Sequence, residues 1–156
     1  MNKVPITRNG FRLLMKELAH LRRSVRPQVL EELFEARSFG IKLDNQQYLL
    51  ARERLMVLQR KIRELEEKLA ACEVVVGRKY YLKRVGFGTC ALIQNIESGE
   101  SLQYQLVGPF ESDIRNGKLS INSPVGKNLL GRAEGEEVTI YTPAGERTYR
   151  ILSIQI

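Results

Sequence analysis

Three residue types are scarce or missing: the 156 residues include two cysteines, one histidine and no tryptophan. Cys72 and Cys90 lie far apart in no recognised spacing, so we expect reduced thiols and no structural zinc site. No run of 18 uncharged apolar residues is present, which argues against a membrane span and a membrane partner. The N-terminus lacks an apolar signal-peptide core, which predicts a cytoplasmic protein.

Catalytic motifs are scarce as well. His20 falls on a predicted helix, where a surface or interhelix position is a better interpretation than a general base. Cys90 falls in an alternating strand pattern, as a small buried thiol would. There is no G-x-S-x-G, and the glycines of G-F-G-T (86–89) precede no helix, unlike a phosphate-binding loop. The sequence does not predict a self-sufficient enzyme.

The charge is positive and uneven, with a net value of +7. Residues 1–76 carry 15 Lys and Arg against 10 Asp and Glu, whereas residues 77–156 carry 10 against 8. Most of the excess therefore lies in the first half of the chain. A positive excess of this size is consistent with an anionic partner, and equally consistent with surface charge that only keeps the protein in solution.

The first half begins with a helical pattern. Thr7 is a candidate N-cap. Apolar residues then follow at coiled-coil spacing: Phe11, Leu14, Leu18, Leu21 and Val25. Pro27 interrupts the pattern because it cannot donate a backbone hydrogen bond. The pattern resumes through Val29, Leu30, Leu33, Phe34 and Ala36. It ends at Gly40, a favourable residue just after a helix.

A second helical segment shows the strongest periodicity in the chain. Its apolar seam recurs at alternating spacings of three and four: Tyr48, Ala51, Leu55, Leu58, Ile62, Leu65, Leu69 and Cys72. Asp44 or Asn45 can cap this helix. Two helices of about 45 Å each, joined by a short turn, predict an antiparallel hairpin whose tip is residues 40–48. An intermolecular coiled coil is the alternative.

The second half predicts a small antiparallel sheet. Five runs are rich in β-forming residues: 86–96, 101–108, 118–122, 137–141 and 147–156. Two stretches, 97–100 and 142–146, have the composition of hairpin turns. One short helix is expected between Ser123 at its N-cap and Gly131 at its end, with Pro124 at the first position. We therefore predict an α+β protein with a hairpin domain at 1–76 and a sheet domain at 77–156.

Basic residues cluster on the predicted hairpin. They are Arg37, Arg52, Arg54, Arg60, Lys61 and Arg63. Arg37 and Arg52 lie at similar distances from the tip on the two helices, so we expect them to come close to each other. Such a pair can grip RNA phosphates without reading sequence. A solvated helix face with ion pairs one turn apart is the simpler interpretation.

Several collinear stretches together resemble the bacterial Gre family of transcript-cleavage factors over essentially the whole chain. They are V-P-I-T-R-N-G, R-P-Q-V, E-A-R-S-F-G, D-N-Q-Q-Y-L-L-A-R-E, L-S-I-N-S-P-V-G-K-N-L-L-G and Y-T-P-A-G-E. The resemblance implies a coiled-coil hairpin followed by an FKBP-like domain. It also implies that the second domain docks on RNA polymerase while the hairpin enters the secondary channel of that enzyme.

The resemblance assigns roles to the tip. Family members place tip acids beside the catalytic magnesium of RNA polymerase and help it cut the nascent RNA 3′ end in backtracked complexes, by two-metal hydrolysis. The factor has no cofactor of its own and holds no metal alone; the magnesium belongs to the polymerase. Arg37 and Arg52 match the basic patch of the family, which contacts RNA.

The tip departs from the family pattern at its acids. Three positions match: Gly40, Asn45 and Tyr48. Ile41 replaces the first acid of the family pattern, and the second acid is present as the shorter Asp44. The position of a further acid holds Gln47. Isoleucine offers no oxygen to magnesium, which demands near-ideal octahedral oxygen coordination. The resemblance therefore implies that Asp44 is the one catalytic tip acid and that cleavage stimulation is weakened or lost.

Other functions stay open at this point. Asp44 could suffice for full cleavage activity, or the protein could occupy the channel and regulate transcription without cleavage. A peptidyl-prolyl isomerase is a distant alternative, because the second domain shows no tryptophan and no evident aromatic-lined pocket. A general DNA- or RNA-binding protein is a further alternative, although no base-stacking motif accompanies the charge.

Overall fold

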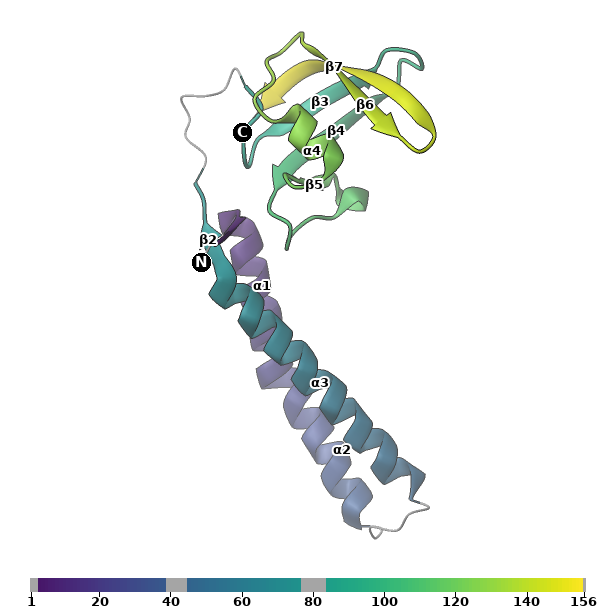
Figure 1. Ribbon diagram of the computed structural model, residues 1–156. Helices are drawn as coiled ribbons and strands as arrows, with labels where there is room; N and C mark the ends of the chain where they lie inside the picture. Colours follow the sequence, from purple (N-terminus) through teal and green to yellow (C-terminus); the bar gives the residue numbers. More distant parts are fainter. Residues whose placement is uncertain (1–2, 39–44, 77–83, 156) are drawn as a thin grey trace. The chain divides into compact units, whose positions relative to one another are not determined.

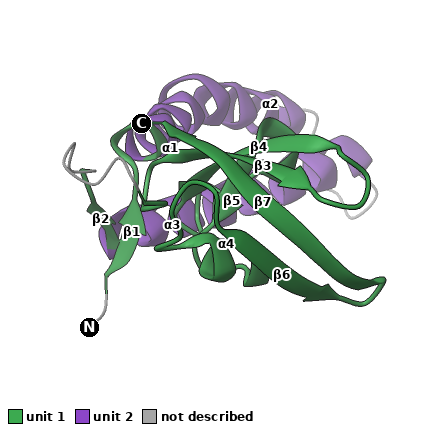
Figure 2. Cartoon of the chain, turned by 90° about the horizontal axis from the view of Figure 1, so that it is seen from above, with its two compact units in different colours: residues 1–10, 72–156 green, residues 11–71 purple. Residues whose placement is uncertain are grey.

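The computed structural model describes residues 3–38, 45–76 and 84–155 (Figure 1). The chain divides into two compact units, coloured separately in Figure 2. Residues 11–71 form a helical hairpin unit, and residues 1–10 with 72–156 form a sheet unit. This arrangement confirms the predicted α+β fold class. The expected domain boundary at 76/77 adjoins residues 77–83, which lie outside the described residues, so it stays a prediction.

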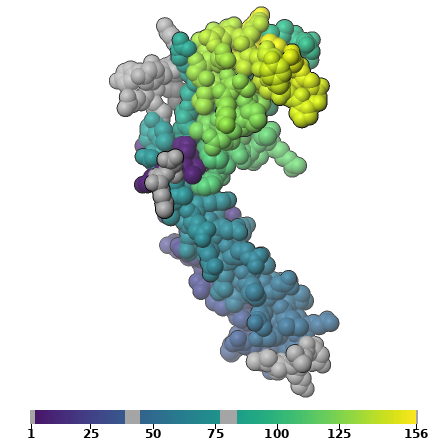
Figure 3. All heavy atoms as spheres, in the orientation of Figure 1, coloured from purple at the N-terminus to yellow at the C-terminus, as the bar shows by residue number. Residues whose placement is uncertain are grey.

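Two antiparallel helical segments build the hairpin unit (Figure 1). The elements are α1 (Arg8–His20), a π-helical turn η1 (Leu21–Val25), α2 (Arg26–Ser38) and α3 (Gln46–Ala71). The 26 residues of α3 correspond to about 39 Å at ~1.5 Å per residue, slightly less than the sequence predicted. In Figure 3, α3 faces the viewer and covers much of α1 and α2. No helix in the described part of the chain is long and apolar enough to cross a membrane.

The break expected at Pro27 takes the form of a π-helical turn. At its end the Arg26 N–H donates to the Leu21 carbonyl, five residues back rather than four. A π turn fits one extra residue into the helix without ending it. The backbone is therefore helical from α1 through α2, and Pro27 stands directly after the wider π turn, as the second residue of α2.

The predicted apolar seams form the core of the hairpin. The buried residues are Leu18, Leu21, Val29, Leu58, Ile62 and Leu65, and the half-buried ones packed on them are Leu14, Val25, Leu55 and Leu69. Leu30 and Phe34 were wrongly assigned to this seam, because they are 43% and 75% exposed. The buried face of α2 follows Val29, Leu33 and Ala36, and each misassigned residue lies one position, or about 100°, past that face.

Ion pairs bridge the helices at the surface. Arg22 pairs with Glu66, Arg54 with Glu32 at 3.0 Å, and Lys61 with Glu17 at 3.5 Å. All of these side chains are strongly solvated, so each pair contributes at most about 1 kcal/mol. They help to set which residues face each other along the hairpin.

The sheet unit is built on five strands in the order β5-β4-β3-β7-β6. Their bounds are β3 (Cys90–Asn95), β4 (Ser101–Val107), β5 (Lys118–Ser120), β6 (Glu137–Thr142) and β7 (Gly145–Gln155). All neighbours are antiparallel except β4 and β5, which are parallel. The core is continuous and apolar: Val85, Ala91, Ile93, Leu106, Leu119, Leu129, Val138, Ile140, Ile151 and Ile154.

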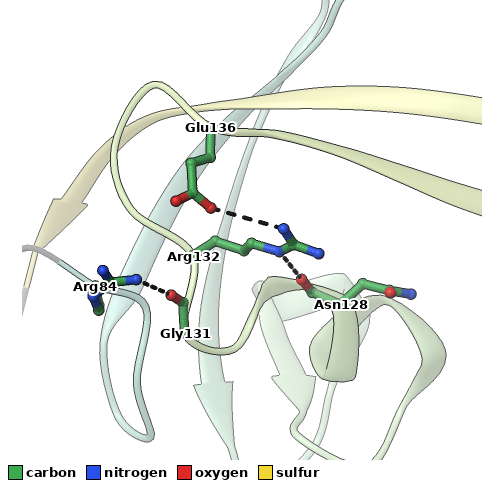
Figure 4. Close-up of polar contacts among 5 residues, drawn as sticks. All are labelled: Arg84, Asn128, Gly131, Arg132 and Glu136. Carbon is green, nitrogen blue, oxygen red and sulfur yellow. Dashed lines mark hydrogen bonds and ion pairs between the residues drawn. The ribbon is translucent and has the colours of Figure 1, made fainter.

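The predicted short helix is present as α4 (Pro124–Leu129), beside a 3-10 turn η3 (Ile114–Asn116). Ser123 caps α4 by accepting from the Gly126 N–H at 3.0 Å, as expected. After the helix, Arg132 donates to the Asn128 carbonyl and lies 3.8 Å from Glu136 (Figure 4). Beside it, Arg84 donates to the Gly131 carbonyl, which ties the beginning of the last described segment to this corner (Figure 4).

A second, two-stranded sheet was not predicted. Strands β1 (Val4–Ile6) and β2 (Cys72–Val74) pair in parallel, and the Val75 N–H adds a bond to the Ile6 carbonyl. Three-residue strands are too short to show alternation, and a parallel partner far away in the sequence leaves no hairpin signal. The pair joins the two ends of residues 4–74 within the sheet unit.

One carboxylate ties the start of α1 to the loop after β4. Thr7 caps the helix, as predicted, by accepting from the Gly10 N–H at 3.0 Å. The backbone N–H and the hydroxyl of Thr7 in turn donate to Glu111 at 3.0 Å each, and the Gly108 N–H donates to the same carboxylate at 3.3 Å. A carboxylate at a helix N-terminus also complements the helix dipole.

Candidate functional site: the distal end of the hairpin

The predicted tip lies partly outside the described residues. Gly40, Ile41 and Asp44 fall in the gap 39–44, so their roles stay predictions. Asn45, Tyr48, Arg37 and Arg52 are described, and they define the site from its two helical sides. Arg37 lies in the last turn of α2, Tyr48 and Arg52 lie in the first turns of α3, and Asn45 directly precedes α3.

Asn45 closes the end of the hairpin. Its side-chain oxygen accepts from the Tyr48 N–H at 3.1 Å, which makes it the N-cap of α3. Its side-chain N–H₂ donates to the Ala36 carbonyl of α2 at 3.1 Å. One amide therefore satisfies an orphan donor of one helix and an orphan acceptor of the other. Of the two caps that the sequence allowed, the structure shows Asn45 in that role.

Tyr48 and the basic residues lie on one flank of the hairpin. The Arg37 guanidinium carbon is 5.9 Å from the centre of the Tyr48 ring, a cation–π distance. Arg52 follows Tyr48 by four residues on α3, so the two are neighbours on one helix face. A row of arginine, tyrosine and arginine thus crosses from α2 to α3. The direct approach of Arg37 to Arg52 stays a prediction.

The opposite flank carries the acids and an apolar groove. The Arg54–Glu32 pair spans it, and a groove of about 440 Å³ is lined by Val25, Val29, Leu50, Val57 and Leu58 with charged residues at its edge. The two flanks therefore differ: one is basic and aromatic, the other mixed in charge and more apolar.

The remaining chemical candidates are dispersed. His20 is exposed, and Cys90 is half-buried rather than fully buried as the strand pattern suggested. Within residues 3–38, 45–76 and 84–155, no three His, Cys, Asp or Glu side chains gather where they could hold a metal. The described residues thus offer arginine contacts for a polyanion beside helix ends that Asn45 joins.

Comparison with known proteins places the whole chain in one family. Residues 4–74 match the profile described as "Transcription elongation factor, N-terminal". Residues 81–156 match "Transcription elongation factor, GreA/GreB, C-term". The chain belongs to the GreA/GreB family of transcription elongation factors. The resemblance to the Gre family over essentially the whole chain is thereby confirmed.

Full-length relatives agree with this Gre assignment. The chain is 39% identical over 155 residues to "Transcription elongation factor GreA" of Syntrophobacter fumaroxidans, covering 99% of each. It is 40% identical to the GreA of Neorickettsia sennetsu, covering 99% of this chain and 98% of that protein. It is 38% identical to the GreA of Pseudomonas aeruginosa, covering 99% of each.

Solved Gre structures are also similar in sequence. GreA factor homolog 1 of Thermus thermophilus is 26% identical, with 99% of each chain covered and a TM-score of 0.44. The GreA/GreB factor of Nitrosomonas europaea is 31% identical, with 67% of this chain and 91% of that chain covered and a TM-score of 0.46.

The double role of Asn45 gives a stability prediction for this Gre factor. Asn45→Ala removes both bonds, and we expect it to lower the free energy of unfolding by about 1–2 kcal/mol. Asn45→Asp keeps the cap acceptor but loses the donor to Ala36, so a smaller loss is expected. Urea unfolding followed by circular dichroism at 222 nm measures both. Equal stability of Asn45→Ala and the unmodified protein would contradict the assigned bonds.

Proposed function

We propose that this Gre factor binds RNA polymerase, inserts the distal end of its hairpin into the secondary channel, and acts there on backtracked or paused complexes. The observation that carries the proposal is the match of both family profiles, in order, along one chain. The relatives are named transcription elongation factors, and the partner follows from that activity.

The shape of the hairpin unit supports insertion. Helix α3 alone is about 39 Å long, and its first residue lies beside the gap that holds Asp44. Asn45 fixes the two helix ends to each other at this point. The two joined helix ends can therefore enter a narrow channel together.

The proposed chemistry is shared between the two proteins. The magnesium of the polymerase supplies stabilisation of the attacking and leaving oxygens during phosphodiester hydrolysis. The part of this chain is to bring the Asp44 carboxylate to that site and to hold RNA phosphates with Arg37 and Arg52. Ile41 brings no oxygen where the family has an acid, so stimulation of cleavage is weak. The factor is not an enzyme by itself.

A channel-occupying regulator that does not cleave is the second candidate, and Ile41 is the observation that favours it. In that case Arg37, Arg52 and the Asn45 cap would contribute only to binding of the polymerase complex. The two candidates share every binding contact and differ in the rate of RNA cleavage.

Binding and restart of halted complexes test the proposal. The full chain, fluorescently labelled, is titrated with purified cognate polymerase halted in a backtracked complex, and resumption of RNA synthesis is measured in parallel. We expect saturable binding and a changed fraction of restarted complexes. Absence of binding at micromolar concentrations of both proteins would overturn the proposed function.

A further inference from the structure

One flank of the distal hairpin combines arginines with exposed apolar side chains. We call it the basic flank; it comprises Arg26, Leu30, Phe34 and Arg37 on α2 and Tyr48, Arg52, Met56 and Arg63 on α3. Spacings of four, four and three residues on α2, and of four, four and seven on α3, place each set on one helix face. The cation–π contact between Arg37 and Tyr48 joins the two rows.

The described acids of this region lie on the opposite flank or at the margin of the basic flank. Glu32 and Glu35 line a hollow with Leu50 and Arg54 on the opposite flank. Glu31 and Glu53 each follow a buried residue by two positions, which places them about 200° from the seam, on the outward face of their helices. Glu31 therefore lies at the margin of the basic flank, three residues before Phe34. The row from Arg37 through Tyr48 to Arg52 contains no carboxylate. At the other end of the basic flank, Glu66 and Glu67 follow Arg63 by three and four residues.

Phe34 is the most exposed apolar side chain on the basic flank, at 75%. It lies three residues before Arg37, so the two side chains are neighbours on α2. Leu30 and Met56 on the same flank are 43% and 55% exposed. An aromatic face among guanidinium groups is what proteins use to bind unpaired nucleobases, because rings stack on bases while arginines hold phosphates.

We propose that Phe34 is a stacking platform for an unpaired base of single-stranded RNA, whose flanking phosphates are held by Arg37 and Arg52. The inference rests on the proposed function for its biological setting, the RNA segment extruded from a backtracked polymerase. It adds a base-binding position to a patch that otherwise contacts phosphates. Stacking is tolerant of sequence, so every RNA base is a ligand.

The charge of this flank favours RNA, and not a protein, as its ligand. Arg37 and Arg52, in one row with Tyr48 and with no carboxylate between them, attract a polyanion to the distal part of this flank. The broader apolar surface, with Leu50 57% and Val57 55% exposed, lies on the opposite flank, where a protein helix would bury more area.

Tryptophan fluorescence tests stacking directly, because the natural chain contains no tryptophan. Phe34→Trp in the full chain gives a single reporter, and Leu50→Trp on the opposite flank is its matched control. Each is titrated at low salt with a single-stranded RNA of about ten nucleotides and with an abasic sugar-phosphate oligomer of equal charge. We expect RNA to quench the indole of the Phe34→Trp variant and the abasic oligomer to leave it bright. The Leu50→Trp variant should respond to neither.

Affinity measurements complete the test. Phe34→Ala is expected to weaken binding of the same RNA about 5- to 100-fold, whereas Phe34→Tyr keeps the ring and retains affinity. Circular dichroism confirms folding, which an exposed side chain should not affect. Equal quenching by the RNA and the abasic oligomer, equal affinity of Phe34→Ala and the unmodified chain, or no RNA binding at low salt overturns the inference.

Polymerase complexes separate this inference from the proposed function. Phe34→Ala should weaken binding to backtracked complexes and leave binding to polymerase without extruded RNA unchanged. Equal weakening in both would assign Phe34 to a protein contact and overturn base stacking, while polymerase binding itself would stand. Failure of the unmodified chain to bind either complex would instead remove the proposed function.

Discussion

Gly108→Ala is expected to destabilise the sheet unit by about 2–3 kcal/mol. A Cβ atom at this position would overlap the Pro5 carbonyl oxygen and approach the Ile6 backbone. Backbone atoms cannot rotate away as a flexible side chain can, so β1 or the loop after β4 must shift. Ile6 is fully buried, and its carbonyl accepts the bond from the Val75 N–H. The shift therefore disturbs the β1–β2 pair as well.

Urea unfolding measures the loss of stability, and hydrogen exchange locates it. The Val75 amide should lose protection in Gly108→Ala, since its acceptor lies on β1. Gly86→Ala is the matched control, because an added Cβ there meets no atom within 4 Å and the backbone needs no positive φ. A midpoint for Gly108→Ala equal to that of Gly86→Ala would contradict the close packing of Gly108 on Pro5.

Ile41→Asp is expected to raise the rate of RNA cleavage in backtracked complexes by about 10- to 100-fold over the unmodified factor. The substitution restores an oxygen ligand where the Gre family has its first tip acid. Asp44→Ala is expected to remove the remaining stimulation, leaving the rate of polymerase alone. The cleavage rates are measured at saturating concentrations of the factor, so that differences in affinity for the polymerase do not affect them.

Ile41→Asn is the matched control for this restoration. It is close in size to aspartate but offers magnesium only a neutral carbonyl oxygen in place of a charged carboxylate, so we expect little gain in rate. If the unmodified factor cleaves as fast as Ile41→Asp, then Asp44 suffices and the weakened-tip hypothesis is wrong. The same comparison decides between a cleavage factor and a channel-occupying regulator.

The hairpin was predictable because its sequence repeats. Apolar residues at spacings of three and four leave few ways to bury them other than helix against helix. Caps were also readable: Thr7, Asn45 and Ser123 each have the side chain that an N-cap needs, and the structure shows each in that role. Turn glycines and alternation predicted the five-stranded sheet in the same way.

Features that depend on distant residues could not be predicted. Nothing local marks Glu111 as the acceptor for Thr7, because the two are 104 residues apart in sequence. The donor role of Asn45 toward Ala36 was missed for the same reason, although its cap role was not. Pro27 signalled an interruption, but nothing in the neighbouring sequence marked its π-helical form.

Phe34 shows how a pattern can mislead. Counting it with Leu33 as part of an apolar run hid the fact that one of two adjacent residues must turn away from the seam. Its 75% exposure, beside Arg37, is what changes its interpretation from core to binding surface. A helical projection of residues 26–38, with charges included, would have separated the two flanks.

The most direct test of the account places the end of the hairpin inside the polymerase. A photo-crosslinking residue is introduced at Gln46, the exposed first residue of α3, and for comparison at Leu13 in α1, which is 47% exposed. Each variant is irradiated on backtracked complexes that carry RNA labelled at its 3′ end. The account predicts crosslinks from position 46 to this RNA and to the catalytic subunits, and none from position 13 to RNA. Crosslinks from position 46 confined to the outer surface of the polymerase would contradict it.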